Sequence, residues 1–168
     1  MSVAFAYVNG DAREVVDFAA RGIDRLFVAI DAAIGVPHAI WLVGIDGKVV
    51  RITCEMVVVE HRFEVGRLAL TIGLPQPPGI RHFDLPSEWR GVSAVELLSV
   101  GERPPWSKTD EGAIDVEAGL LFHASPHQIW SIVVGAQPCT LAINAPFVPI
   151  ASDPQYASDD YRVRPLVA

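Results

Sequence analysis

The amino-acid sequence predicts an α+β fold, with one N-terminal amphipathic helix packed on a curved, mostly antiparallel sheet of about seven strands. Residues 11–35 carry apolar side chains at the three- and four-residue spacing of a helix. An Asp-Gly pair separates two apolar runs, and later runs alternate apolar and polar residues. No helical pattern separates these later runs, as a parallel sheet would require. A barrel or sandwich without a helix is the alternative.

The helix is predicted to begin after Asp11, because Asp is a favoured N-cap and Glu14 completes a capping-box pattern three residues later. It is predicted to end at Gly35, with a proline just beyond. The apolar stripe that would face the sheet consists of Val16, Ala19, Ile23, Leu26, Phe27, Ile30 and Ile34.

Gly22 is the weak point of this helix, because glycine costs about 1 kcal/mol relative to alanine. The alternative is a helix to residue 21 and a strand over residues 23–30. The single helix is preferred, because Asp24 and Asp31 lie off the apolar stripe, whereas the strand would leave neither of its faces clean.

A β-hairpin is predicted around the Asp46-Gly47 turn. Both central residues of a type I′ turn need a positive φ, and Asp-Gly is a preferred pair for this reason. A two-residue turn pairs Ile45 with Lys48 and so fixes the register. One apolar surface then combines Ala39, Trp41, Val43, Val50, Ile52, Cys54, Met56 and Val58. The tryptophan is accordingly expected in the core.

Further strands are predicted in a run up to residue 74 and at residues 93–100, 114–123, 128–135 and 140–144. In the run at 114–123, alternation points Ile114, Val116, Ala118, Leu120 and Phe122 inward. Residues 75–91 contain four prolines and two glycines without periodicity, which predicts a long ordered loop. Residues 145–168 are predicted to form an irregular tail that wraps the body.

The chain length of 168 residues predicts one domain, spanning residues 1–168. No uninterrupted apolar run reaches the roughly 18 residues of a membrane helix, so no membrane partner is expected. The N-terminus lacks the regions of a secretory signal, and we expect a cytoplasmic protein. The net charge of −7 argues against nucleic acid, whose phosphates require a basic surface, and permits a basic protein partner.

No motif in the sequence names a reaction. The Gly-rich signatures of dinucleotide and phosphate sites do not occur, and neither does the H-E-x-x-H zinc signature. The segment around Ser93 lacks the second glycine of a nucleophile elbow. His123 and His127 flank a turn but supply only two of the three ligands that a zinc or iron site needs. We therefore predict no catalytic residue, no cofactor and no metal.

The candidate binding surface combines an aromatic side chain with acidic groups. A loop at residues 103–112 carries the tryptophan beside two adjacent prolines, and the following strand points acidic residues and a histidine outward. Aromatic anchors with a charged rim are how interfaces concentrate binding energy. The candidate residues are Trp106, Asp110, Glu111, Asp115, Glu117 and His123.

The leading hypothesis is a non-enzymatic protein-binding module, in the manner of a small immunity protein that caps a basic partner protein. The alternative is a small-molecule carrier or enzyme with an apolar pocket between the helix and the sheet, which the hydrophobic content of 51% favours. Exposed apolar strand edges also predict a homodimer.

Overall fold

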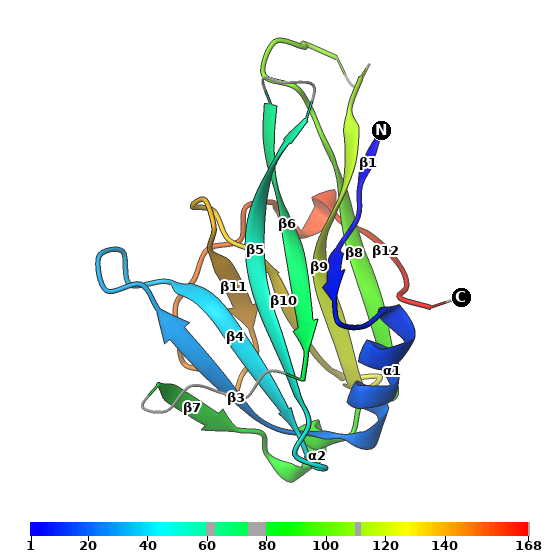
Figure 1. Ribbon diagram of the computed structural model, residues 1–168, viewed down its shortest axis with the longest axis vertical. Coiled ribbons are helices and arrows are strands. Elements are labelled where there is room, and N and C mark those ends of the chain that lie inside the picture. Colours follow the sequence, from blue (N-terminus) through cyan, green and yellow to red (C-terminus); the bar gives the residue numbers. More distant parts are fainter. Residues whose placement is uncertain (60–62, 74–79, 110–111, 168) are drawn as a thin grey trace.

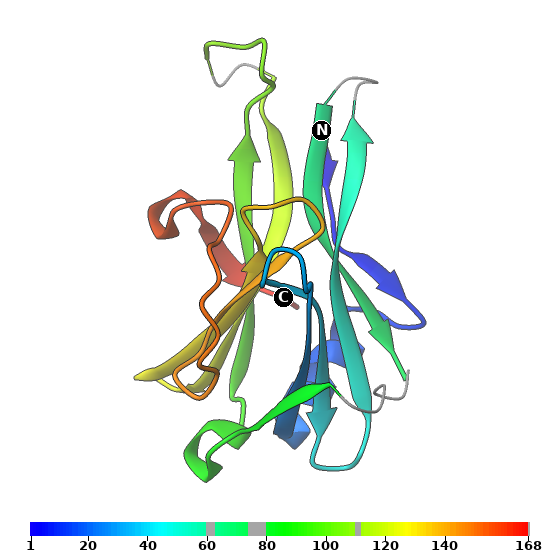
Figure 2. The same cartoon turned by 90° about the vertical axis from the view of Figure 1, so that its left-hand side faces the viewer.

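The seven runs that the sequence predicts as strands all form strands, but they divide between two facing sheets, as Figures 1 and 2 show. The computed structural model describes residues 1–59, 63–73, 80–109 and 112–167. Sheet A has the order β11-β10-β9-β8-β12, with β1 beside β9, and sheet B has the order β2-β6-β5-β4-β3-β7. The fold is therefore a mostly antiparallel sandwich with few helices, and the prediction of a single curved sheet is wrong.

The strands of sheet A are β1 (Ser2–Val3), β8 (Ala94–Glu102), β9 (Ile114–Ser125), β10 (Gln128–Val134), β11 (Leu141–Asn144) and β12 (Arg162–Pro165). The strands of sheet B are β2 (Ala6–Val8), β3 (Ile23–Ile30), β4 (Pro37–Gly44), β5 (Val49–Val59), β6 (Phe63–Ile72) and β7 (Arg81–Asp84). The helices are α1 (Ala12–Arg21), α2 (Ser87–Arg90) and the 3-10 turn η1 (Ser158–Asp160). Residue 74, the predicted end of β6, lies outside the described residues.

Helix α1 begins where the sequence predicts and ends much earlier. The backbone N–H of Glu14 donates to Asp11 Oδ1 at 3.1 Å, which confirms Asp11 as the N-cap. The helix ends at Arg21, because Gly22 adopts a φ of 108° and β3 follows directly. The predicted helix to residue 35 is therefore wrong, and the alternative of a short helix and a strand is correct.

Strand β3 lacks a polar face because both of its surfaces are packed. Leu26 and Val28 are buried between the two sheets. Phe27 and Ala29 pack against a second apolar cluster, on the outer face of sheet B. A strand that is apolar on both faces loses the alternation that identifies a half-buried strand, so its pattern can be mistaken for a helix.

The β4–β5 hairpin has a three-residue loop instead of the predicted two-residue turn. The backbone N–H of Gly44 donates to the Lys48 carbonyl oxygen at 2.8 Å, and Gly47 adopts a φ of 82°. A left-handed residue at the third position is typical of three-residue hairpin loops. The strand pairing is consequently shifted by one residue, so that Leu42 and Val50 are directly opposite.

This shift exchanges the two faces of β4, since a slip of one residue turns every side chain over. Ile40 and Leu42 point into the core, whereas Trp41 lies in the cluster on the outer face of sheet B. Trp41 is still buried, and the Arg51 guanidinium lies 5.7 Å from its ring centroid. The predicted surface that combines Trp41 with Val50 and its neighbours is therefore wrong.

Helix α1 closes one side of the sandwich, and does not lie across the face of one sheet as predicted. Its buried residues Val15, Phe18 and Ala19 join the core between the sheets. The helix contacts β4 of sheet B and β8 of sheet A, and Figure 1 places it beside the lower ends of the strands. The first strands also link the two layers, because β1 pairs with β9 and β2 pairs with β6.

The core between the sheets is filled from β9, as the alternation predicts, and from β10. The predicted inward residues of β9 are all buried, namely Ile114, Val116, Ala118, Leu120 and Phe122. Phe122 stacks on Trp130 with ring centroids 4.2 Å apart, and Trp130 contacts Phe147 edge to face. The outward face of β9 is thereby fixed as well, and it carries Asp115, Glu117 and His123.

Candidate functional site

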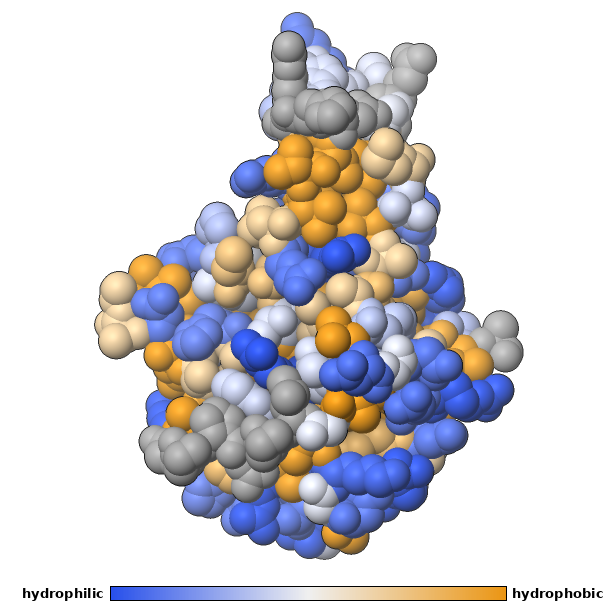
Figure 3. Space-filling model, in the orientation of Figure 1, coloured by the Kyte–Doolittle hydropathy of each residue, from blue (hydrophilic) through white to orange (hydrophobic). Residues whose placement is uncertain are grey.

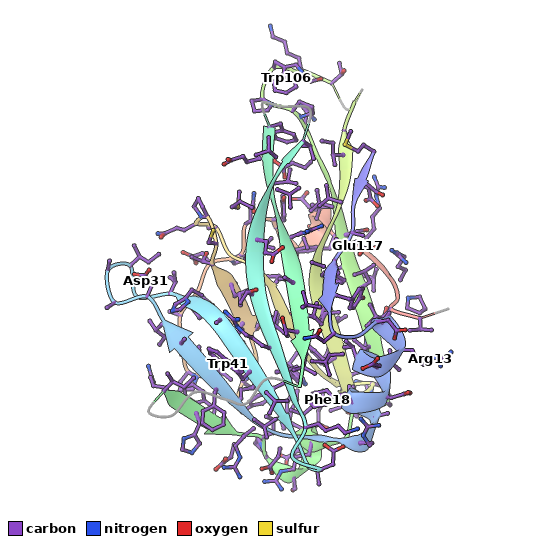
Figure 4. All side chains as sticks on the ribbon, viewed as in Figure 1. Arg13, Phe18, Asp31, Trp41, Trp106 and Glu117 are labelled. Carbon is purple, nitrogen blue, oxygen red and sulfur yellow. The ribbon has the colours of Figure 1, made fainter. Side chains whose placement is uncertain are left out.

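Trp106 lies at the far tip of the β8–β9 hairpin, as Figure 4 shows. Of the four tryptophans, all of which lie in the described residues, Trp106 alone is more than half exposed, at 57%. Its ring meets the Phe63 ring of sheet B edge to face, with centroids 6.0 Å apart. The β8–β9 hairpin and strand β6 therefore meet at this aromatic pair, and Trp106 stays largely exposed to solvent.

The loop that carries Trp106 is held by local hydrogen bonds. The backbone N–H of Ser107 donates to the Pro104 carbonyl oxygen at 2.9 Å, and the Ser107 hydroxyl donates to the Thr109 carbonyl oxygen at 2.8 Å. Pro104 itself is buried. Asp110 and Glu111, which the sequence analysis assigns to the same surface, lie outside the described residues.

Glu117 binds two parts of the chain that lie far from it in sequence. The backbone N–H of Phe5 donates to Glu117 Oε2 at 2.8 Å, and Arg164 Nη2 donates to Oε1 at 2.5 Å. Burial, reinforced by the charge of Glu117, raises the pKa of the nearby Tyr7 to about 12. Glu117 therefore ties the N-terminal segment and β12 to β9, a role that no local pattern in the sequence indicates.

Asp115 and His123 lie on the same face of β9 but at different ends of the hairpin. Asp115 is paired with Arg162 at 4.0 Å, and its side chain is 45% exposed. An exposed pair at this distance contributes little to stability. The carboxylate is only partly accessible, because its Oδ1 atom is buried. His123 lies near the opposite end of β8 and faces the Glu96 carboxylate through Nε2. The structure therefore groups Asp115 with the Trp106 end and separates His123 from it.

A groove of about 740 Å³ begins at the base of the Trp106 loop and continues along the edge of sheet A. Its polar lining combines three carboxylates with two guanidinium groups and a phenol, from Glu102, Asp159, Asp160, Arg103, Arg162 and Tyr156. Burial, reinforced by Glu102, raises the pKa of Tyr156 far above its usual range. The C-terminal segment thus adds acidic groups to the predicted surface, and only the tertiary structure brings them there.

The alternative hypothesis places an apolar pocket between the helix and the sheet. The cavity that the structure describes beside α1 does not fit this prediction. The cavity there has a volume of about 300 Å³ and is lined mainly by charged residues, among them Asp17, Arg21 and Lys48. The apolar residues of α1 face the core instead. A mainly apolar cavity lies elsewhere, on the outer face of sheet A.

Figure 3 shows apolar side chains gathered over the upper ends of β5 and β6, below the tip. Val58 on this hairpin is 57% exposed.

In the residues that the structure describes, no three His, Cys, Asp or Glu side chains gather closely enough to hold a metal ion. The described part of the chain also has no helix long and apolar enough to cross a membrane. Comparisons with family models, with curated proteins and with solved structures found no match to this chain.

Proposed function

We propose that this protein is a non-enzymatic binding module that caps a basic protein partner, in the manner of an immunity protein. The contact surface is the Trp106 loop together with the charged groove at its base, in which carboxylates outnumber guanidinium groups by three to two. One observation supports this choice above others: a tryptophan that is 57% exposed lies at the tip of the loop whose base borders a groove lined by three carboxylates and two guanidinium groups. The homodimer that the apolar strand edges suggest stays a separate prediction.

The chemistry of this surface suits a partner with both apolar and basic groups. Exposed aromatic residues supply much of the energy at protein interfaces, because they bury a large area with little loss of entropy. Glu102, Asp159 and Asp160 would attract lysine or arginine side chains and would accelerate association at low salt. The net charge of −7 acts in the same direction over longer distances.

Glu117 is left out of the contact surface in this proposal. Its two carboxylate oxygens already accept hydrogen bonds from Phe5 and Arg164, and its side chain is only 15% exposed. Removing it would disturb the N-terminal segment before it disturbed a partner. Asp115 stays in the contact surface, because its carboxylate is partly exposed beside the groove.

Site-specific photo-crosslinking in a lysate of the cells that produce the protein tests the proposal. A benzophenone amino acid at Lys108, in the Trp106 loop, is expected to capture one protein in stoichiometric amounts. The same group at Ile34, which is 44% exposed in a distant turn, is expected not to capture it. No capture from position 108, or equal capture from both positions, would count against this surface.

The affinity of the purified, captured partner then decides between specific and incidental contact. Trp106→Ala is expected to weaken binding at least tenfold, as for an interface hot spot. The triple variant E102Q/D159N/D160N is expected to weaken binding and to flatten its salt dependence. The matched control is D17N/D84N/E88Q, which removes the same charge from exposed sites elsewhere. If the control and the groove variant behaved alike, general charge would explain the binding and the groove would not.

A further inference from the structure

The outer face of sheet A contains an apolar cavity of about 320 Å³ that the proposed function does not use. Strands β8 to β11 form its floor, and the segment at residues 152–161 and β12 form its walls. The floor is mainly aliphatic and is built from Leu98, Leu121, Ser131, Val133 and Ala142. Its volume lies at the lower end of the range for small-molecule sites, which is about 300–1,000 Å³.

Backbone hydrogen bonds hold the walls of this cavity apart. On one side, Gln155 N–H donates to the Val134 carbonyl oxygen at 3.1 Å, and Ala136 N–H donates to the Asp153 carbonyl oxygen at 2.8 Å. On the other side, β12 pairs with β8 along its whole length. Since each wall is anchored through its main chain, the segment cannot collapse onto the apolar floor without breaking these bonds.

The groups around the cavity are electrically neutral. None of the described residues that line it carries a charged side chain. Its polar contributions come from hydroxyl and amide groups, including Ser131, Asn144 and Ser158. The Tyr161 hydroxyl in the wall is buried and has no hydrogen-bond partner among the described residues. A charged ligand would lose its hydration here without gaining a counter-charge, whereas a neutral ligand would not.

We propose that this cavity binds a small, uncharged and mainly apolar molecule that carries one hydroxyl or carbonyl group. The aliphatic floor would bury its hydrocarbon part, and a neutral hydrogen-bonding group of the wall would orient its polar end. This site lies on the outer face of sheet A and does not depend on the Trp106 surface. The two proposals can therefore fail separately.

Three eight-carbon probes that differ in the head group and its charge test the proposed ligand class. Octan-1-ol at sub-millimolar concentration is expected to raise the unfolding temperature of the full chain, because it binds the folded state alone. Octanoate and octylammonium at the same concentrations are expected to leave it unchanged. Displacement of the neutral fluorophore N-phenyl-1-naphthylamine by octan-1-ol gives an independent measure. Equal stabilisation by all three probes, or by none of them, would overturn the proposal.

Two variants place the binding at this cavity. Ala142→Leu fills the floor, and Val163→Trp covers the rim, where Val163 is 51% exposed and tolerates a larger side chain. Each is expected to weaken fluorophore binding at least tenfold while the unfolding temperature shows that the protein is folded. Val58→Trp is the matched control, since Val58 is an equally exposed strand valine of sheet B.

Trp106→Ala is expected to bind the fluorophore like the wild-type protein, which separates this site from the partner surface. Wild-type affinity in folded Ala142→Leu and Val163→Trp would show that the probe binds elsewhere and would overturn the proposal. So would a fluorescence signal that is lost as protein concentration rises, because a second copy of the chain would then be the occupant.

Discussion

The outer face of each sheet carries an apolar cluster that is separate from the main core, but the two clusters are covered in different ways. On sheet B, the cluster of Ala39, Trp41 and Val49 is filled by large rings from the sheet itself. Trp41 lies beside Arg51, and Phe27 packs on the His82 ring with centroids 5.6 Å apart. These side chains adjust by rotation about their own bonds, so they fill the face.

On sheet A, the cluster of Leu98, Val133 and Ala142 is covered by a crossing segment of main chain. That segment is fixed by backbone hydrogen bonds, including the one between Gln155 and Val134. A cover held through its backbone cannot move closer when the side chains below are small. The same kind of apolar strand face therefore gives a packed surface or a cavity, depending on what covers it.

The largest effect that this comparison predicts is the loss of Trp41. Trp41→Ala is expected to lower the free energy of unfolding by about 3–5 kcal/mol, since it removes a large buried ring, and both the lost apolar contacts and the remaining cavity cost free energy. Urea denaturation followed by circular dichroism measures the change. Trp106→Ala removes the same side chain from an exposed site and is expected to cost less than about 1 kcal/mol. Equal losses in the two variants would show that the sheet B face is not a packed cluster.

A matched pair of alanines sharpens the difference between the two faces. Ala39 and Ala142 are both buried in outer-face clusters, at 1% and 4% exposure. Ala39→Leu is expected to destabilise the protein by about 1–3 kcal/mol, because Ala39 is almost fully buried in its cluster and the added carbons would overpack it. Ala142→Leu is expected to change stability by less than about 1 kcal/mol, because the cavity accepts them. The reverse order of the two free energies of unfolding would contradict the comparison.

The sequence predicts the strands that follow one clear pattern. It misses β3, which is packed on both faces, and the short strands β1, β2, β7 and β12, so the predicted loop at 75–91 and the predicted irregular tail each contain a strand. The β9 residues from Ile114 to Phe122 alternate clearly because one face is in the core and the other is partly solvated. Strand β3 is packed on both faces, so its pattern favours a helix. The predicted β4–β5 register is wrong by one residue, because the loop type depends on the backbone conformation of Gly44 to Gly47. The Asp-Gly dipeptide alone does not determine that conformation.

In the candidate site too, some features can be predicted from the local sequence and others depend on residues that are far apart in the chain. Trp106 is recognisable as a loop aromatic, and the structure places it at an exposed tip. The partners of Glu117 are Phe5 and Arg164, which come from the two ends of the chain. Asp159 and Asp160 reach the groove only because β12 pairs with β8. The assignment of strands to two sheets is a long-range property, and no local periodicity encodes it.

The smallest predicted effect concerns the alkaline stability of the sheet A face. Burial raises the pKa of Tyr161 to about 12, from an ordinary value near 10. Between these pH values the unfolded chain releases this proton while the folded protein retains it, so stability is complete below about pH 10 and falls as pH rises toward 12. Tyr161→Phe removes this dependence and is expected to lose about 1 kcal/mol less than the wild-type protein between pH 10 and 11.5.

Near neutral pH, Tyr161→Phe is expected to be neutral or slightly stabilising, because it removes a buried hydroxyl that has no partner among the described residues. Urea denaturation at pH 7, 10 and 11.5 measures both effects in one series, and the titration of all other groups cancels in the difference between the two proteins. If the variant lost stability at pH 7, the hydroxyl would be hydrogen-bonded in solution. If the two proteins lost stability in parallel above pH 10, Tyr161 would titrate normally. The segment at residues 152–161 would then not hold the phenol away from water.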